Sequence, residues 1–139
     1  MSTDAKQQNI DAQKRWAQVA EEGRYEIFDD ILADDFTDHD PGDYAPTKEG
    51  LTQFFKDFRT AFPDLSLEVE EMVATDEYVA FRYTARGTHK GEFMGHAPTG
   101  KSFEAPAMQI GKWRDGKCTD RWGVTDQSAI LKQLGLIDV

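Results

Sequence analysis

The sequence predicts an α+β fold in which helices come first and a meander of antiparallel strands follows. Before residue 64 apolar residues recur at helical spacing, and after it they alternate with polar residues, as in half-buried strands. Short turn signals separate the alternating segments, so consecutive strands are expected to pair as hairpins. This order indicates a curved antiparallel sheet of four to six strands wrapped around three N-terminal helices, with a short C-terminal helix. The length of 139 residues suits one domain over 1–139.

Three helices are predicted in the first half of the chain. The first covers about residues 4–22, where Trp16 and Val19 belong to one apolar stripe, and the second covers Tyr25–Ala33. The turn-rich, acidic segment that follows is expected to be a loop. The third helix, over 47–62, has Thr47 as its N-cap. It gives the strongest helical signal, because five large apolar residues share one face: Leu51, Phe54, Phe55, Phe58 and Phe62.

Alternation predicts the strands of the second half. Two strands around Leu65–Glu70 and Val79–Thr84 are joined by a turn at 74–77, and further strands are expected at Thr88–Phe93, Lys101–Trp113 and Lys117–Thr125. Glycines at 87, 91, 95 and 111 predict bends or bulges that curl the sheet. A last helix is expected over Asp126–Leu134, with Asp126 as N-cap and Gly135 after its end.

Composition excludes several classes of function. The net charge of −10 repels phosphate backbones and anionic headgroups, so no nucleic acid and no membrane are expected as partners. No apolar run is long enough for a membrane span or a secretory signal, so a cytoplasmic location is expected. The single cysteine, Cys118, is expected to be a strand residue. The three histidines lack metal-ligand spacing and no phosphate-binding loop appears, so neither a metal nor a cofactor is predicted.

Four segments, in the same order, resemble the SnoaL-like polyketide cyclase (ester cyclase) family. They are FTDHDP (36–41), GLTQFFKDFRTAFPDL (50–65), GTHKGEFMGHAPTGK (87–101) and DGKCTDRWGVTDQSAILKQLG (115–135). The resemblance covers roughly residues 8–137. It implies the nuclear transport factor 2-like cone, with a pocket between the inner sheet face and the helices. It also implies cofactor-free ring closure by aldol condensation, a hydrophobic small-molecule ligand, and a homodimer formed through the convex sheet face.

Asp120 is the first candidate for catalysis. On its strand it shares a face with Trp122 and Val124, and the resemblance implies an acid/base aspartate on this strand. A carboxylate in an apolar pocket can take up a proton from carbon α to a carbonyl. The alternative is a sheet-edge carboxylate paired with Arg121 or Lys117.

His39, in the family's histidine position, is the second catalytic candidate, and its alternative is a structural role in the acidic loop. Trp122 is predicted to form a flat wall for the ligand, with core packing as its alternative. Gln109 stands where many relatives carry His or Asp, so it offers a hydrogen bond but cannot titrate. The predicted substrate-binding set is Trp122, Gln109, Phe36, Phe58, Tyr83 and Met108.

Three further polar residues are expected to be structural: His89 as a loop anchor, His96 as an exposed residue, and Arg82 as a partner in a surface or interface ion pair.

The leading functional hypothesis is a cofactor-free cyclase, isomerase or lyase that acts on a largely apolar carbonyl compound. The main alternative is a non-catalytic domain that binds a hydrophobic metabolite. Hydrolysis of an epoxide is a third possibility, which would require two or three polar residues to hold a water molecule.

Overall fold

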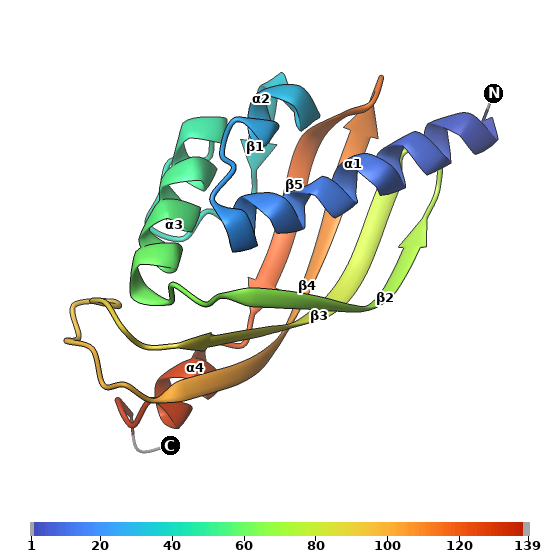
Figure 1. The fold of residues 1–139 in the computed structure, drawn as a ribbon. Helices are drawn as coiled ribbons and strands as arrows, with labels where there is room; N and C mark the ends of the chain where they lie inside the picture. The colour runs from blue at the N-terminus through green and yellow to red at the C-terminus, as the bar shows by residue number, and fades with distance from the viewer. Residues whose placement is uncertain (1, 138–139) are drawn as a thin grey trace.

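The computed structural model describes the backbone of residues 2–137 and the side chains of residues 4–137, and it has the expected α+β architecture (Figure 1). The helices are α1 (Ser2–Glu22), α2 (Ile27–Ile31), α3 (Lys48–Ala61) and α4 (Gln127–Gln133). The strands are β1 (Leu32–Asp38), β2 (Ser66–Ala74), β3 (Tyr78–Thr88), β4 (Ser102–Arg114) and β5 (Lys117–Thr125). No helix in this part of the chain is both long and apolar enough to cross a membrane.

The five strands form one sheet in the order β1-β5-β4-β3-β2. All neighbours are antiparallel except β1, which runs parallel to β5 at the edge. The sheet is curved and does not close, and α1, α2 and α3 lie across its concave side (Figure 1). On the opposite, convex face, Met108, Ile110 and Val124 of β4 and β5 are exposed.

The core fills the space between the three helices and the concave face. Trp16 and Val19 of α1 pack with Phe28 of α2, and the rings of Trp16 and Phe28 meet edge to face at 5.1 Å. Phe62, which follows α3, is fully buried and contacts Phe103 of β4 at 4.8 Å between ring centroids. Burying each such aromatic side chain stabilises the fold by about 1.5–3 kcal/mol. The helical stripes read from the sequence are therefore the core faces of these helices.

Several expected boundaries are confirmed. The side chain of Thr47 accepts a hydrogen bond from the Gly50 N–H at 3.2 Å, and that of Asp126 accepts one from the Ala129 N–H at 3.0 Å. Both residues are N-caps, as predicted. The expected strand at Lys117–Thr125 has the same bounds as β5.

The acidic segment after α2 was wrongly expected to be a loop. Its first part is β1, and Thr37 pairs with Asp120 of β5. The strand begins at Leu32, so α2 is shorter than predicted. The two consecutive aspartates at 34 and 35 hid the strand, since they depart from simple alternation and remain exposed at the sheet edge.

The expected strand at Thr88–Phe93 is also wrong, because β3 ends at Thr88 and a loop follows. His89, fully buried, anchors this loop as predicted: its Nδ1 accepts a hydrogen bond from the Thr99 N–H at 3.2 Å. The N–H groups of Lys90 and Gly91 both donate to the carbonyl of Ala61 at the end of α3. These bonds hold the loop against α3, where it forms part of the pocket described below.

The register of the sheet is interrupted beside Glu70, beside Thr119 and between Leu32 and Thr37 of β1, not at the glycines expected to form bends or bulges. Gly87 and Gly111 instead make room on the concave face. A Cβ at Gly87 would lie 2.9 Å from the Cβ of Phe62, and one at Gly111 would lie 3.0 Å from Nε1 of Trp113. These glycines allow close packing rather than an extra residue in the strand.

Candidate functional site

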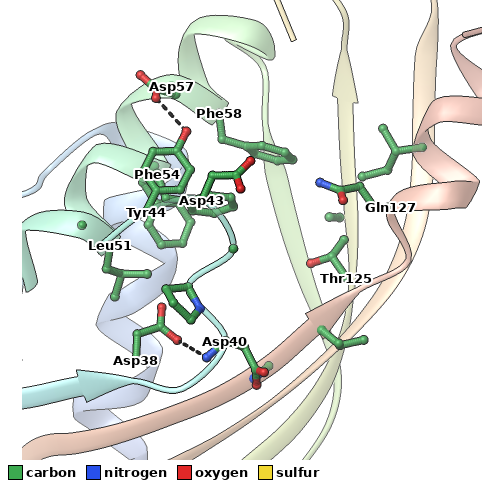
Figure 2. A pocket seen from close by; sticks show the side chains of 18 of the residues that line it. Asp38, Asp40, Asp43, Tyr44, Leu51, Phe54, Asp57, Phe58, Thr125 and Gln127 are labelled. Atoms are coloured by element: carbon green, nitrogen blue, oxygen red, sulfur yellow. Dashed lines mark hydrogen bonds between the residues drawn. The ribbon is translucent and has the colours of Figure 1, made fainter. Parts of the chain in front are cut away.

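A cavity of about 840 Å³ lies between the concave face of the sheet, α3 and the loop that follows β1 (Figure 2). This volume is within the range of small-molecule sites. Its lining combines aromatic side chains with charged and hydroxyl-bearing ones, and Tyr44, Asp43 and Asp57 lie close to the rings of Phe54 and Phe58 (Figure 2). The cavity is therefore the candidate site for a ligand that is apolar over most of its surface.

The aromatic side of the pocket comes from α3. Leu51, Phe54 and Phe58 follow at helical spacing, so one face of the helix presents all three side chains to the cavity (Figure 2). The rings of Phe54 and Phe58 stack at 5.4 Å with an interplanar angle of 20°. Phe93, from the loop after β3, meets Phe58 edge to face at 5.9 Å. Helix and loop together make a continuous apolar wall.

A buried ion pair forms the polar side of the pocket. Asp38, at the end of β1, accepts a hydrogen bond from Nη1 of Arg121 at 3.0 Å, and their side chains are only 4% and 13% exposed. Nε of Arg121 donates to Oε1 of Gln109 on β4 at 2.9 Å. The parallel pairing of β1 with β5 brings Asp38 beside Arg121. Carboxylate and amide thus fix the guanidinium in place.

Gly123 lies next to this ion pair and allows it to form. A Cβ at this position would be 2.8 Å from Nη2 of Arg121, so only glycine leaves the guanidinium its place. The Gly123 N–H donates to Oδ2 of Asp40 at 2.9 Å. Arg121 and Asp40 therefore flank a residue that has no side chain, and all three line the cavity.

Tyrosines contribute two hydroxyl groups. Tyr44 donates to Oδ2 of Asp57 on α3 at 2.7 Å, which ties the loop after β1 to the helix (Figure 2). Burial and this bond to a carboxylate raise the pKa of Tyr44 to about 12. Tyr83 of β3 also lines the cavity. Burial raises the pKa of Tyr83, although the positive charge of Arg121 opposes this shift. Both phenols are hydrogen-bond donors at neutral pH.

The described part of the chain contains no group of three or more His, Cys, Asp or Glu side chains arranged to hold a metal ion.

The model of one family, described as SnoaL-like polyketide cyclase, matches residues 10–134. The chain belongs to this family.

Solved structures agree with that assignment. IdmH from Streptomyces antibioticus, described as a candidate polyketide cyclase, is 32% identical, with 92% of this chain and 99% of IdmH covered and a TM-score of 0.81. AclR from Streptomyces galilaeus, described as a candidate hydroxylase, is 25% identical, with 100% and 89% covered and a TM-score of 0.81. TsrD from Streptomyces laurentii is similar in fold, with 21% identity, 94% and 96% covered and a TM-score of 0.85. No curated protein matches the chain.

The fold is the expected SnoaL-like cone, but Asp120 does not line the cavity. Asp120 pairs with Lys112 and Trp122 pairs with Ile110, so these side chains share the convex face, whereas Arg121 and Gly123 line the cavity on the concave side. The expectation of Asp120 in an apolar chamber is therefore wrong. It arose because Trp122 and Val124 give the outward side of β5 the more apolar pattern.

Asp120, His39 and Trp122 nevertheless gather into one cluster. Nε2 of His39 lies 2.9 Å from Oδ1 of Asp120, and the imidazole stacks on the indole of Trp122 at 4.6 Å. Thr119 donates to the second carboxylate oxygen at 2.7 Å. Partial burial disfavours the ionised form of Asp120, but the hydrogen bonds from His39 and Thr119 outweigh it and lower its pKa. The expected alternative partners, Arg121 and Lys117, are not the ones it uses.

The predicted substrate-binding residues divide into two groups. Phe58 and Tyr83 line the cavity, and Gln109 faces the same side and holds Arg121. Phe36 is buried in the core without lining the cavity, while Met108 is 62% exposed on the convex face. The expectation that Met108 and Phe36 line the pocket is wrong, because β4 and β1 turn these side chains elsewhere.

The structural assignments of the remaining polar residues are confirmed. Nε of Arg82 forms a surface ion pair with Glu71 at 3.1 Å, and His96 is exposed. Cys118 is a fully buried residue of β5.

Three charged lining residues escaped the sequence argument: Asp38, Asp40 and Arg121. Arg121 lies in the middle of the predicted strand and points to the side opposite Trp122. A charged side chain on a covered face of a sheet needs a partner, so this position was a usable signal. Asp38 carried no such signal, because its strand was not recognised.

Proposed function

We propose that the chain is a cofactor-independent enzyme of the polyketide cyclase type that acts on a mostly apolar carbonyl compound by acid/base catalysis. The observation that carries this proposal is the pairing of an aromatic wall with a fixed, buried guanidinium across one cavity. An apolar ligand would lie against Phe54 and Phe58, with a carbonyl oxygen directed toward the polar side.

Arg121 is the proposed electrostatic stabiliser. Two of its five N–H groups donate to Asp38 and Gln109, which leaves the rest of the guanidinium for a ligand oxygen. Tyr83 lines the same cavity, and Gln109, which is not a lining residue, holds the guanidinium in place. Donors fixed before the reaction stabilise an enolate oxygen without reorganising.

Asp40 is the proposed base. Of the other acidic lining residues, Asp38 is committed to Arg121, and both oxygens of Asp57 accept hydrogen bonds, from Tyr44 and Gln53. Asp43 and Glu92 make no hydrogen bond to the Arg121 strand within the described residues, whereas Asp40 does. One oxygen of Asp40 is held by the Gly123 N–H, which leaves the other to accept a proton next to Arg121.

The proposed reaction begins when Asp40 removes a proton α to the carbonyl, and the electron pair of the C–H bond forms an enolate whose oxygen is bound by Arg121. For ring closure, the enolate carbon attacks a second carbonyl of the same molecule. A new C–C bond forms, and the resulting alkoxide takes back the proton from Asp40. Return of the proton to a different carbon would instead give an isomerisation.

A test that needs no knowledge of the true substrate is exchange of the α-protons of β-tetralone in D₂O, followed by ¹H NMR. The protein is expected to accelerate exchange, and Asp40→Asn is expected to lower the catalysed rate by about 10²-fold or more. Asp120→Asn is the matched variant, because it removes a carboxylate from the convex face only. Loss of exchange in Asp120→Asn, with exchange retained in Asp40→Asn, would return the catalytic role to Asp120 and His39.

The alternative is a non-catalytic binding domain, favoured by the fact that the most buried carboxylate in the cavity, Asp38, is already paired. Under this alternative β-tetralone would shift the amide resonances of residues such as Phe58 and Thr125 without any acceleration of exchange.

We also propose that a second copy of the chain covers the convex face. Register places Val73, Ala80, Ile110 and Trp122 in one row across four strands, and Met108 and Val124 lie beside it. Val73, Met108 and Val124 are 64%, 62% and 70% exposed. The face also carries charges of both signs: Arg82 and Lys112 are positive, and Glu71 and Asp120 are negative. A two-fold axis can therefore place opposite charges together.

Sedimentation is expected to find a dimer at micromolar concentration, and Ile110→Asp is expected to dissociate it, whereas Lys90→Asp, in the loop after β3, is not. A monomeric wild-type chain would contradict the proposal.

Two broader expectations remain predictions: a single domain over residues 1–139, which limited proteolysis tests, and a cytoplasmic location, which cell fractionation tests.

A further inference from the structure

We propose that the pocket selects a ligand that carries a basic amine and rejects one that carries a carboxylate. The inference rests on the proposed function in one respect only, namely that the cavity holds a small molecule. It concerns the charge at the mouth of the pocket, and it does not depend on whether any reaction occurs there.

The lining of the cavity is strongly unbalanced in charge. Among the residues that the structure describes, the acidic lining residues are Asp38, Asp40, Asp43, Asp57 and Glu92, and the only basic one is Arg121. The contact between Asp38 and Arg121 uses that one positive charge. Four carboxylates therefore remain without a cationic partner in the lining, and they come from two loops and from α3.

The hydrogen bonds made by these carboxylates do not cancel their charge. Asp57 is bound by the neutral groups of Tyr44 and Gln53, and Asp40 by the backbone of Gly123. Besides burial, the charges of Asp57 and Asp43 contribute to the raised pKa of Tyr44, as expected if a phenol at the mouth is exposed to a negative field. A ligand carboxylate entering here would be repelled by several like charges at once.

The apolar wall and the inner end of the cavity define the rest of the ligand. Phe54 and Phe58 present stacked rings beside the acidic rim, and a cation is attracted to such rings. At the polar side, Arg121 lines the cavity, and its guanidinium is held by Asp38 and by Gln109, which is 4% exposed. The N–H groups of Arg121 that these two residues do not use can bind a ligand oxygen. The structure therefore fits an apolar body with a carbonyl oxygen inward and an ammonium group at the mouth.

Three probes of matched ring and chain test this inference: naphthylethylamine, naphthylethanol and naphthylacetate. Their dissociation constants would be measured by ¹⁵N NMR titration at low salt. We expect the amine to bind roughly tenfold or more tighter than the carboxylate, with the alcohol between them, and the difference to shrink at high salt.

A pair of double variants separates the pocket from the overall charge. Asp43→Asn with Glu92→Gln neutralises two exposed lining residues that have no ion-pair partner among the described residues. Glu77→Gln with Asp115→Asn makes the same change in net charge at two exposed turn positions outside this pocket. We expect the first double variant to lose at least about half of the logarithmic preference for the amine, and the second to keep it.

The outcomes distinguish the two proposals. If all three probes bind equally, or if both double variants behave alike, the charge selection is refuted while the pocket stands. If none of the probes binds in the cavity, as judged from the amides of Phe58 and Thr125, both the inference and the proposed small-molecule function fail.

Discussion

Replacing Arg121 by Met tests whether the buried ion pair organises the polar side of the pocket. Methionine has a similar length and keeps the apolar part of the arginine side chain, so the change mainly removes the guanidinium. It leaves the carboxylate of Asp38, 4% exposed, without its charged partner at 3.0 Å. It also leaves Oε1 of Gln109 without the donor 2.9 Å away. Two buried polar groups thus lose hydrogen bonds at once.

The expected loss is about 3 kcal/mol in the free energy of unfolding, because removal of one partner of a buried pair typically costs 3–5 kcal/mol and the pocket admits some water. Arg15→Met is the matched control. It removes the same group from α1, away from the convex face, and its ion pair with Asp30 at 3.2 Å has side chains 41% and 64% exposed. An exposed pair of this kind is worth about 1 kcal/mol or less.

Urea denaturation followed by circular dichroism measures both losses. A second variant, Arg121→Met combined with Asp38→Asn, removes the uncompensated charge and should recover at least about 1 kcal/mol relative to Arg121→Met alone. If Arg121→Met and Arg15→Met agree within about 0.5 kcal/mol, or if the second change recovers nothing, then Arg121 is not held by a buried charge pair and the argument for the polar side of the pocket fails.

The remaining predictions concern acid stability, thiol reactivity and the room around the guanidinium. Because hydrogen bonds lower the pKa of Asp120, its ionised form stabilises the fold at neutral pH; this contribution should disappear as the pH falls below about 4, and Asp120→Asn should flatten the dependence of Tm on pH there. Burial raises the pKa of Cys118 to about 12, so a thiol reagent at pH 8 should react about a thousandfold more slowly than with an exposed cysteine; fast reaction of the folded protein would contradict this burial. Gly123→Ala should displace the Arg121 guanidinium and lower β-tetralone exchange by about tenfold or more, with about 1 kcal/mol or less lost in stability; unchanged exchange would count against Arg121 as the oxygen-binding group.

Local periodicity fixed the parts of the fold that were predicted correctly. The phenylalanines at 54, 55 and 58 identified α3 as a helix packed against the sheet. Phe62, which directly follows α3, belongs to the same core. Alternation likewise identified β4, whose residues from Ser102 to Arg114 are exposed and buried in turn. Such patterns can be read along the chain because each residue's neighbours in sequence decide which face it shares.

The candidate site was predicted only in part, because its residues meet through pairings between distant segments. Tyr83 and Phe58 were recognised as lining residues, and Gln109 was expected to offer a hydrogen bond if it faced inward. Asp38 and Arg121 were missed, since they are 83 residues apart and meet only because β1 adds to the edge of the sheet in parallel with β5. No local pattern marks that pairing.

By itself, the sequence determined that helices precede a meander, that α3 has an aromatic face, and that Asp120, Trp122 and Val124 share one side of their strand. Only the tertiary structure decided which side of β5 faces the cavity. A strand has two faces, and the helices cover the concave one, so Arg121 and Gly123 reach the pocket while the more apolar side faces outward. The physical reason is that a cavity is space left open for a ligand, so the side chains around it need not be the most apolar ones on their strand.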